Sequence, residues 1–286
     1  MSAGIAVDGK TRVYGILGHP VSSSLSPAMQ NAAFRALGIN AVYVPFPVTP
    51  EELPEAVRGL ASAGVGGFNL TVPHKLAILP LLDEITPEAR AIGAVNTVRC
   101  EDGRMAGANT DGEGFLRSLA HDLDWQPEAK RVLLLGAGGA ARGIAVSLLG
   151  RGVAALHIAN RTPANAEALA ADCRALFPNI AVAASGLEQA KDAAPDLLVN
   201  ATTVGMGDGA APVTLEEVGV REAVLDIVYA PPETPLLAQA RVLGLKAANG
   251  IGMLLHQGWL AFNFWTGSEA PLDVMRAALE EALQGR

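Results

Sequence analysis

The sequence predicts an α/β protein with mainly parallel sheets, and two observations support this prediction. Short apolar runs typical of strands alternate with longer stretches of helical spacing, which is the order expected of β-α-β units. One apolar run, at residues 132–135, leads into a glycine-rich turn and then into a helical stretch. The length of 286 residues is sufficient for two domains, each with its own core.

The first half of the chain predicts a mixed sheet. Apolar runs at residues 13–17, 41–46 and 67–71 indicate strands. Residues 94–99 and 105–108 flank a turn signal at 101–104 and indicate a hairpin, so not all strands of this half are parallel.

Helices of the first half are indicated by their start signals. Ser26 is assigned as the N-cap of a helix that ends near residue 38. Thr49 and Glu52 have the spacing of a capping box and predict a second helix. A third helix is expected after Pro73.

The second half repeats the alternation of strand and helix after a connecting helix at residues 111–123. Strands are predicted at residues 132–135, 154–159, 180–184, 196–200, 223–228 and 245–248. Two helices, at about 251–266 and 271–284, close the chain. We therefore expect a domain boundary near residues 112–128.

Composition excludes several functional classes. The net charge is −8 without a basic run, so nucleic acid is not an expected partner. The apolar runs are too short for a bilayer and the N-terminus lacks signal-peptide features, so no membrane association is expected. Cys100 and Cys173 lack metal-ligand spacing and the five histidines form no cluster. We expect no catalytic metal and a reduced, cytoplasmic setting.

The glycine-rich turn predicts a dinucleotide site of the Rossmann type. Gly136 permits the tight turn after the strand, and Gly138 lets a pyrophosphate approach the backbone. The small side chain of Ala141 lets the helix pack close to the strand. The helix N-terminus then offers free N–H groups to the phosphates.

The end of the next strand predicts which dinucleotide binds. Asn160, Arg161 and Thr162 stand where an NAD-binding domain usually has an acidic residue. Arg161 can pair with the 2′-phosphate of NADP, and its two neighbours can donate hydrogen bonds. A charge-assisted hydrogen bond of ~1.5–3 kcal/mol favours NADP over NAD by about ten- to hundredfold. The alternative is a solvated Arg161 beside a helix cap at Thr162.

Polar residues at strand ends of the first half could form a second ligand site. The serines at residues 22–26 offer hydroxyl and N–H groups to a carboxylate, although turn formation and helix capping explain them as well. Thr71 ends a strand and Lys75 follows one turn later, where a solvated lysine is the alternative. Asn96 and Asp111 also lie near strand ends, and Asp111 has an alternative explanation as an N-cap.

Eight segments form an ordered set along nearly the whole chain. In the first half these are GHPVSSSLSP at residues 18–27, GFNLTVPHK at 67–75, GAVNT at 93–97 and NTDG at 109–112. In the second half they are NRT at 160–162, NATTVGM at 200–206, DIVY at 226–229 and GIGMLLHQ at 250–257. With these segments the chain resembles the shikimate dehydrogenase family.

The resemblance implies a reversible reduction of 3-dehydroshikimate to shikimate by NADPH, with Lys75 and Asp111 as the catalytic pair. A lysine ammonium suits this role because it can stabilise charge on a ketone oxygen and deliver a proton. The resemblance implies substrate binding by Ser24, Ser26, Thr71, Asn96, Tyr229 and Gln257. It implies cofactor binding by Gly136, Ala137, Gly138, Gly139, Ala140, Asn160, Arg161, Thr162, Thr202, Val204, Gly250 and Met253.

The resemblance also implies two domains with a cleft between them. Residues 1–111, completed by helices at 251–286, would form an α/β substrate domain with a mixed, mainly parallel sheet. Residues 112–250 would form the Rossmann-type NADP domain. Asn165 stands where many NADP-specific members carry a second arginine, so the NADP preference is expected to be smaller than is usual in the family, with Arg142 as a partial substitute.

Several alternatives remain open. A quinate/shikimate or aminoshikimate dehydrogenase with relaxed use of NAD and NADP is the first, and a non-catalytic dinucleotide sensor is the second. A homodimer is also left open, because the aromatic residues of the penultimate helix can belong to an interface, although a place in the core is the favoured interpretation: Trp259, Phe262, Phe264 and Trp265.

Overall fold

The computed structural model describes residues 7–191, 193–207 and 209–284, which form two compact units. One unit contains the described residues up to Thr110 together with those from Gln257 onward, and the other is Asp111–His256. The sequence predicts boundaries at 111/112 and 250/251, whereas the units meet at 110/111 and 256/257. Helix α9 (Ile251–Thr266) is therefore shared between them.

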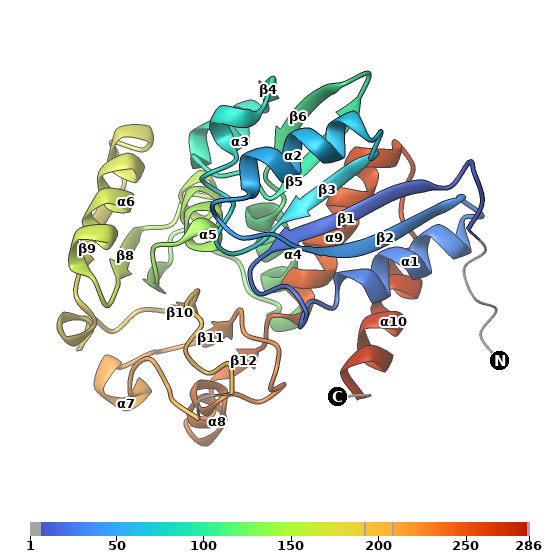
Figure 1. The fold of residues 1–286 in the computed structure, drawn as a ribbon. Coiled ribbons are helices and arrows are strands. Elements are labelled where there is room, and N and C mark those ends of the chain that lie inside the picture. Colours follow the sequence, from blue (N-terminus) through green and yellow to red (C-terminus); the bar gives the residue numbers. More distant parts are fainter. Residues whose placement is uncertain (1–6, 192, 208, 285–286) are drawn as a thin grey trace. The chain divides into compact units, whose positions relative to one another are not determined.

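The first unit contains a mixed sheet in the order β2-β1-β3-β5-β6-β4 (Figure 1). Its strands are β1 (Arg12–Gly18), β2 (Ala41–Pro47), β3 (Gly67–Leu70), β4 (Glu84–Ile85), β5 (Thr97–Glu101) and β6 (Arg104–Ala108). β5 and β6 form the predicted antiparallel hairpin, and Asp102 and Gly103 at its turn have φ values of 49° and 75°. Positive φ at both turn residues is typical of a type I′ turn, which matches the strand twist.

Helices cover both faces of this sheet. The helices of the unit are α1 (Ser26–Ala36), α2 (Leu53–Ser62), α3 (Pro87–Ile92) and α10 (Leu272–Gln284), with the later part of α9. On one face, Leu53 and Val57 of α2 pack with Leu17 and Phe68. The other face is aromatic: Tyr14, Phe34, Tyr43, Phe262 and Trp265 have ring centroids 5.0–5.9 Å apart.

Three helix predictions of the first half need correction. Ser26 is the first helical residue and not the N-cap, because Leu25 occupies the cap position and Ser24 Oγ accepts the Ser26 N–H. The helix expected from Thr49 begins at Leu53, where the following proline fits the first turn because it needs no N–H partner there. Thr49 and Glu52 still bond each other through the N–H and hydroxyl of Thr49.

The helix expected after Pro73 is absent from the described structure. The chain instead makes turns from Val72 to Ile78 and a short 3₁₀ helix, η1 (Leu79–Leu81). Pro80 has no N–H to continue an α-helix, and only six residues lie between it and Pro73. This stretch is therefore too short for the expected helix. The sequence analysis also missed α3, although Thr86 carries a clear signal: its side chain accepts the Ala89 N–H as an N-cap.

The second unit contains a parallel sheet in the order β12-β11-β10-β7-β8-β9. Its strands are β7 (Arg131–Leu135), β8 (Ala155–Ala159), β9 (Ala181–Ser185), β10 (Leu197–Asn200), β11 (Ala223–Asp226) and β12 (Lys246–Ala248). Its helices are α4 (Asp111–Leu123), α5 (Gly139–Gly150), α6 (Pro163–Leu176), α7 (Leu215–Val218) and α8 (Pro235–Val242), with η2 (Leu187–Ala190). The chain thus winds outward in both directions from β7.

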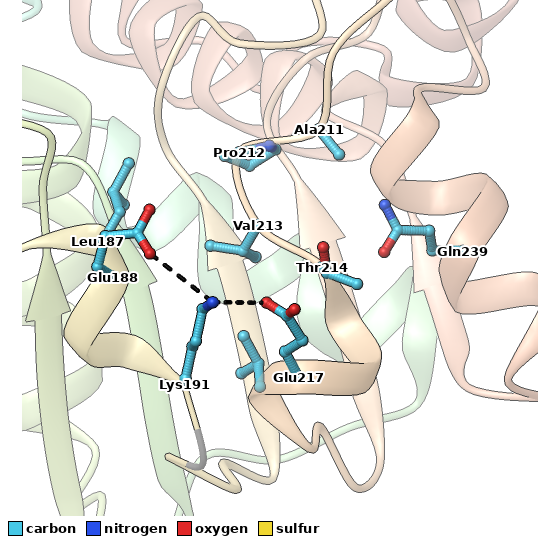
Figure 2. A pocket seen from close by; sticks show the side chains of 10 residues that line it. Leu187, Glu188, Lys191, Ala211, Pro212, Val213, Thr214, Glu217 and Gln239 are labelled. Carbon is cyan, nitrogen blue, oxygen red and sulfur yellow. Dashed lines mark ion pairs between the residues drawn. The ribbon is translucent and has the colours of Figure 1, made fainter.

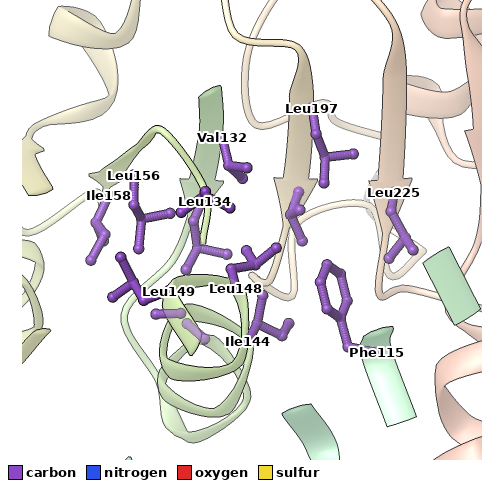
Figure 3. Packing of buried hydrophobic residues seen from close by; sticks show 14 of the residues in the cluster. Phe115, Val132, Leu134, Ile144, Leu148, Leu149, Leu156, Ile158, Leu197 and Leu225 are labelled. Carbon is purple, nitrogen blue, oxygen red and sulfur yellow. The ribbon is translucent and has the colours of Figure 1, made fainter. Parts of the chain in front are cut away.

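Alternate residues of β7 belong to two cores. Val132 and Leu134 point to one face, where they pack with Ile144 and Leu148 of α5 and Phe115 of α4 (Figure 3). Leu133 and Leu135 point to the other face, toward residues of α7 and α8. Burial on both faces explains why this strand reads as a continuous apolar run. Within the described residues, no helix is both long and apolar enough to span a membrane.

Candidate active site

One edge of the first sheet collects the polar segments. The pairings Leu17↔Leu70, Asn69↔Thr97 and Thr97↔Ala108 place the ends of β1, β3 and β6 beside the start of β5. The loops that leave this edge contain Ser24, Thr71, Lys75, Asn96 and Thr110. Ligand sites of α/β sheets commonly lie outside such strand ends.

A buried chain of hydrogen bonds runs along this edge. Tyr43 Oη donates to Asn69 Oδ1 over 2.7 Å, and Asn69 Nδ2 donates to Thr97 Oγ1 over 2.9 Å. Burial raises the pKa of Tyr43 well above its ordinary value of 10.0, and a hydrogen bond with Ser26 lowers it partly. Ser26, only 3% exposed, is thereby tied to the centre of the sheet.

Asn96 extends this chain toward helix α9. Its Oδ1 accepts from the Thr110 N–H over 2.8 Å and from Thr97 Oγ1 over 3.0 Å. Its Nδ2 donates to Thr110 Oγ1 over 2.9 Å and approaches Gln257 Oε1 at 3.5 Å. The structure therefore brings together three of the predicted substrate residues, Ser26, Asn96 and Gln257.

Lys75 lies in the turn that replaces the expected helix. Its side chain is half-buried, and its backbone oxygen accepts from the Val95 N–H over 2.8 Å. Thr71 is half-buried just beyond β3 and donates its N–H to the Leu17 oxygen over 2.9 Å. Ser24 is half-buried, and its hydroxyl accepts the Ser26 N–H over 3.3 Å.

Asp111 and Tyr229 belong to the second unit, whereas Lys75 and the other predicted substrate residues belong to the first. Asp111 is the first residue of α4 and is 3% exposed. Tyr229 follows β11 and is half-buried.

The glycine-rich turn of the second unit lies where the strand order reverses, between β10 and β8. Gly136 has φ +109°, and a Cβ there would lie 2.9 Å from the Ala201 oxygen. Gly138 is the N-cap of α5, makes no side-chain cap bond, and has open space where a Cβ would lie. Ala137, Gly139 and Ala140 are half-buried beside it. This turn can accept an anionic group at a helix N-terminus.

The residues after β8 include an exposed cation, Arg161. Arg161 and Thr162 are exposed, and Asn160 donates its side-chain N–H to the Thr162 oxygen over 2.9 Å. Thr162 occupies the N-cap position of α6, but its hydroxyl makes no cap bond. Arg142, which we considered as a substitute for a second arginine, pairs instead with Asp172 of α6 through both guanidinium nitrogens.

The loops after β10 and β11 are held by a second polar network. Asn200 Oδ1 accepts from the Thr202 N–H over 3.1 Å and from the Thr202 hydroxyl over 2.7 Å. Thr202 Oγ1 in turn accepts the Val204 N–H over 3.1 Å. These bonds fix the backbone at Thr202 and Val204, the two residues of this loop that are predicted to bind the cofactor.

Gly250, just before helix α9, and Met253, in its first turn, lie in different surroundings. A Cβ at Gly250 would lie 1.9 Å from the Ile227 oxygen, so this close approach of two backbones requires glycine. Met253 is 6% exposed and belongs to the hydrophobic core of the second unit. Of the predicted cofactor residues, Met253 is thus the one most deeply engaged in core packing.

The sequence analysis assigned no role to several residues of these networks: Tyr43, Thr97, Thr110, Asn200, Asp226 and Thr234. A signal existed for two of them, since Asn200 and Asp226 are polar residues that end otherwise apolar strands. Tyr43 and Thr97 gave none, because tyrosine and threonine are ordinary strand residues.

A separate hollow of the second unit holds the ion pairs of Lys191 (Figure 2). Lys191 Nζ lies 3.2 Å from Glu217 Oε2 and 3.7 Å from Glu188 Oε2. The hydrogen bond to Glu217 raises the pKa of Lys191. None of the predicted cofactor residues lines this hollow.

Comparison with known proteins decides the family. Family models match at residues 16–98 (shikimate dehydrogenase substrate binding domain), 118–203 (shikimate / quinate 5-dehydrogenase) and 250–280 (shikimate 5′-dehydrogenase C-terminal domain). A shikimate dehydrogenase (NADP+) of Geobacter metallireducens is 52% identical over 283 residues, which cover 97% of this chain and 99% of the relative. The chain belongs to the shikimate dehydrogenase family.

Solved structures agree with this family assignment. A crystal structure of a shikimate dehydrogenase in complex with NADP+ is 40% identical, with a TM-score of 0.90 and 98% of each chain covered. A Thermus thermophilus shikimate 5-dehydrogenase, in complex with NADP(H) and shikimate, is also 40% identical. Its TM-score is 0.85, with 95% of this chain and 100% of that chain covered. The two-domain α/β fold is therefore that of the family.

Proposed function

We propose that this chain catalyses the reversible, NADPH-dependent reduction of 3-dehydroshikimate to shikimate, with Lys75 and Asp111 as its catalytic pair. Family membership and 52% identity to a shikimate dehydrogenase (NADP+) support the reaction. The observation that carries the proposal is the buried network of the first unit, which joins Ser26, Asn96 and Gln257 at one sheet edge.

The substrate offers groups that these residues can bind. Its carboxylate accepts hydrogen bonds, so we assign it to the hydroxyls of Ser24 and Ser26, with Tyr229. Its ring hydroxyls both donate and accept, which suits the amides of Asn96 and Gln257 and the hydroxyl of Thr71. Because the network holds Ser26 and Asn96 in fixed orientations, little side-chain entropy remains to be lost on binding.

The second unit fits NADP in three respects. The N-terminus of α5 faces open space at Gly138, which suits a pyrophosphate. Gly136 and Gly250 allow neighbouring backbones to approach closely at the carboxyl edge of the sheet. Arg161 is an exposed cation after β8, which suits a 2′-phosphate.

The bound dinucleotide supplies the hydride for ketone reduction. We assign Lys75 the task of stabilising the negative charge on the ketone oxygen and of donating its Nζ proton to that oxygen. In the reverse direction, neutral Lys75 accepts the hydroxyl proton. Asp111 is assigned to orient the ammonium.

Three further assignments are also proposals. The residues up to 111, with the C-terminal helices, bind the substrate, and residues 112–250 bind NADP. The setting is the cytoplasm, which the two free, buried cysteines support. The homodimer is a proposal that the aromatic residues of α9 do not support. Phe262 and Trp265 are buried, and Trp259 Nε1 donates to the Ala270 oxygen within the same unit, so these side chains need no partner subunit to cover them.

A rate comparison tests the proposed reaction. Purified protein is given shikimate or quinate, each with NADP or NAD, and formation of the reduced dinucleotide is followed. We expect the highest kcat/KM for shikimate with NADP. A higher kcat/KM for quinate would support the quinate/shikimate alternative. Binding of NADPH without turnover of any substrate would contradict the enzyme assignment and support the sensor alternative.

A further inference from the structure

His74 is a buried residue in a loop whose neighbours point outward. Its exposed fraction is 0%, whereas Val72 is 60% exposed and Leu76 is 45% exposed. The chain therefore turns an imidazole inward and two apolar side chains outward, which reverses the usual preference. Such an arrangement has a cost, so the imidazole must supply something that an apolar side chain cannot.

One ring nitrogen of His74 has a partner and the other does not. Nε2 lies 2.8 Å from the backbone oxygen of Val48. A carbonyl oxygen only accepts, so Nε2 carries the proton and donates it. Nδ1 is enclosed and has no hydrogen-bond partner among the described residues. Among the described residues, the bond to the Val48 oxygen is thus the one hydrogen bond that the His74 ring makes.

This bond completes a set that holds the loop before and after Lys75. The Val72 oxygen accepts from the His19 N–H over 3.0 Å, and the Lys75 oxygen accepts from the Val95 N–H over 2.8 Å. Val48 itself donates its N–H to the Gly18 oxygen over 3.2 Å. The bond from His74 Nε2 to the Val48 oxygen, which we call the anchor, lies between the backbone bonds of Val72 and Lys75 along the chain. Of these three bonds, it is the one made by a side chain.

We propose that His74 is a positioning residue, whose Nε2–H bond to Val48 fixes the turn that presents Lys75. This inference rests on the proposed catalytic role of Lys75. His74 itself touches no reacting atom in this proposal. The turn forms no regular α-helix, and His74 makes two local backbone bonds in it, from its N–H to the Thr71 oxygen and from the Ile78 N–H to its oxygen. Loss of the side-chain anchor therefore loosens the backbone directly before Lys75. A displacement of about 1 Å at a catalytic group is enough to lower turnover strongly.

The test uses two pairs of variants in the full-length protein. In His74→Gln the amide nitrogen takes the place of Nε2 and can still reach the Val48 oxygen, whereas in His74→Asn it is too short. Trp265→Phe is the matched control, because it removes another buried ring N–H, which donates to the Val98 oxygen over 2.9 Å. Lys75→Met is the reference for loss of the ammonium. For each variant, kcat, KM for shikimate, the dissociation constant for NADPH and Tm are measured.

We expect His74→Asn to lower kcat by about 10- to 100-fold, as small misplacements of catalytic groups do. We expect KM for shikimate to change by less than about threefold, because the lost interaction acts in the transition state. His74→Gln is expected to restore most of kcat. Trp265→Phe is expected to lower Tm without lowering kcat at temperatures well below Tm, which separates positioning from general stability.

Two outcomes would overturn the inference, and they are distinguishable. If Lys75→Met is inactive but His74→Asn and His74→Gln turn over equally fast, His74 does not position the lysine and the proposed function stands. If Lys75→Met retains near-normal turnover, the proposed role of Lys75 fails first. Should His74→Asn not fold, His74→Leu takes its place, because a leucine fills the buried space but cannot donate to the Val48 oxygen. A kcat for His74→Leu equal to that of His74→Gln would then overturn the inference.

Discussion

Asn200 Nδ2 donates to Asp226 Oδ1 over 2.9 Å and so joins the last residues of two neighbouring strands, β10 and β11. Asp226 also accepts from the Val228 N–H over 3.0 Å and from the Thr234 hydroxyl over 2.7 Å. Thr234 is the N-cap of α8. One buried carboxylate therefore links the two strand ends, the loop before Tyr229 and a helix start.

Replacing Asp226 should weaken NADP binding through the loop after β10. In Asp226→Leu the side-chain N–H groups of Asn200 lose the shorter of their two bonds and keep only the one to the Val204 oxygen, and Asn200 in turn holds Thr202. We expect the free energy of unfolding to fall by about 1–3 kcal/mol per buried polar group left unpaired. We also expect a higher dissociation constant for NADPH, measured by fluorescence titration. Asp226→Asn keeps an acceptor for both N–H donors and should bind NADPH nearly as wild type does. Equal binding by Asp226→Leu would show that the network does not shape the site.

Because of Asp226, we expect the free energy of unfolding to depend on pH. Burial raises its pKa above the ordinary value of 3.8, and the bonds from Thr234, Val228 and Asn200 lower it partly. The folded protein then binds this proton more tightly than the unfolded chain does. Its contribution to the free energy of unfolding is therefore lost as the pH rises from about 3.8 through the folded pKa. Relative to wild type, Asp226→Asn should gain stability across this window, as measured by urea unfolding. A pH-independent difference would contradict this.

Gly136 and Gly138 should respond differently to alanine. In Gly136→Ala the new Cβ meets the Ala201 oxygen at 2.9 Å on a backbone with φ +109°. We expect a loss of about 1–3 kcal/mol in the free energy of unfolding, together with weaker NADP binding. In Gly138→Ala the methyl group enters open space, so the stability should be kept while NADP binding falls. Unchanged NADP binding in Gly138→Ala would place the pyrophosphate elsewhere.

Arg161 should determine most of the NADP preference. Arg161→Gln is expected to lower kcat/KM with NADP by about ten- to hundredfold, since it removes a charge-assisted hydrogen bond, and to leave NAD unaffected. Asn165→Arg should raise the ratio of NADP to NAD use, because it adds a cation on the first turn of α6. Arg174→Gln, a change at an exposed ion pair further along α6, is the control. An equal loss with both dinucleotides would argue against 2′-phosphate recognition.

Tyr43 should couple the stability of the first unit to substrate binding. Tyr43→Phe leaves Asn69 Oδ1 buried without its donor, which should cost about 1–3 kcal/mol in the free energy of unfolding. Because Ser26 loses its partner as well, KM for shikimate should rise by about three- to tenfold. Tyr14→Phe, which removes a hydroxyl outside this network, should leave KM unchanged. An unaltered KM in Tyr43→Phe would separate the network from the substrate.

Much of the fold could be predicted from local signals. The parallel strands of the second unit are continuous apolar runs, and the hairpin at Asp102 and Gly103 follows from its turn residues. The errors arose where two local signals competed. At Ser26 the hydroxyl of Ser24 accepts the Ser26 N–H and the helix begins at Ser26 itself, and after Pro73 a second proline stopped a helical pattern.

The candidate site was predictable in part. The places of Gly136 after β7 and Arg161 after β8 could be predicted, because a glycine turn and a strand-end cation have characteristic sequence contexts, and their roles in NADP binding stay predictions. The networks around Asn96 and Asp226 depend on which residues of distant strands face each other, such as Asn69 opposite Thr97. Register of this kind is set by long-range packing, and no local pattern reports it. The inward turn of His74 is of the same kind, since its partner Val48 comes from another strand connection.

The central claim is that the ammonium of Lys75 provides the proton and the charge for ketone reduction. The most direct test is the pH dependence of kcat for shikimate oxidation in wild type and in Lys75→Met, with shikimate binding measured separately. We predict that Lys75→Met binds shikimate but loses at least about 10²-fold in kcat, and that its residual rate lacks the pH dependence of the wild-type rate. A variant with near-normal turnover and an unchanged pH profile would contradict the account.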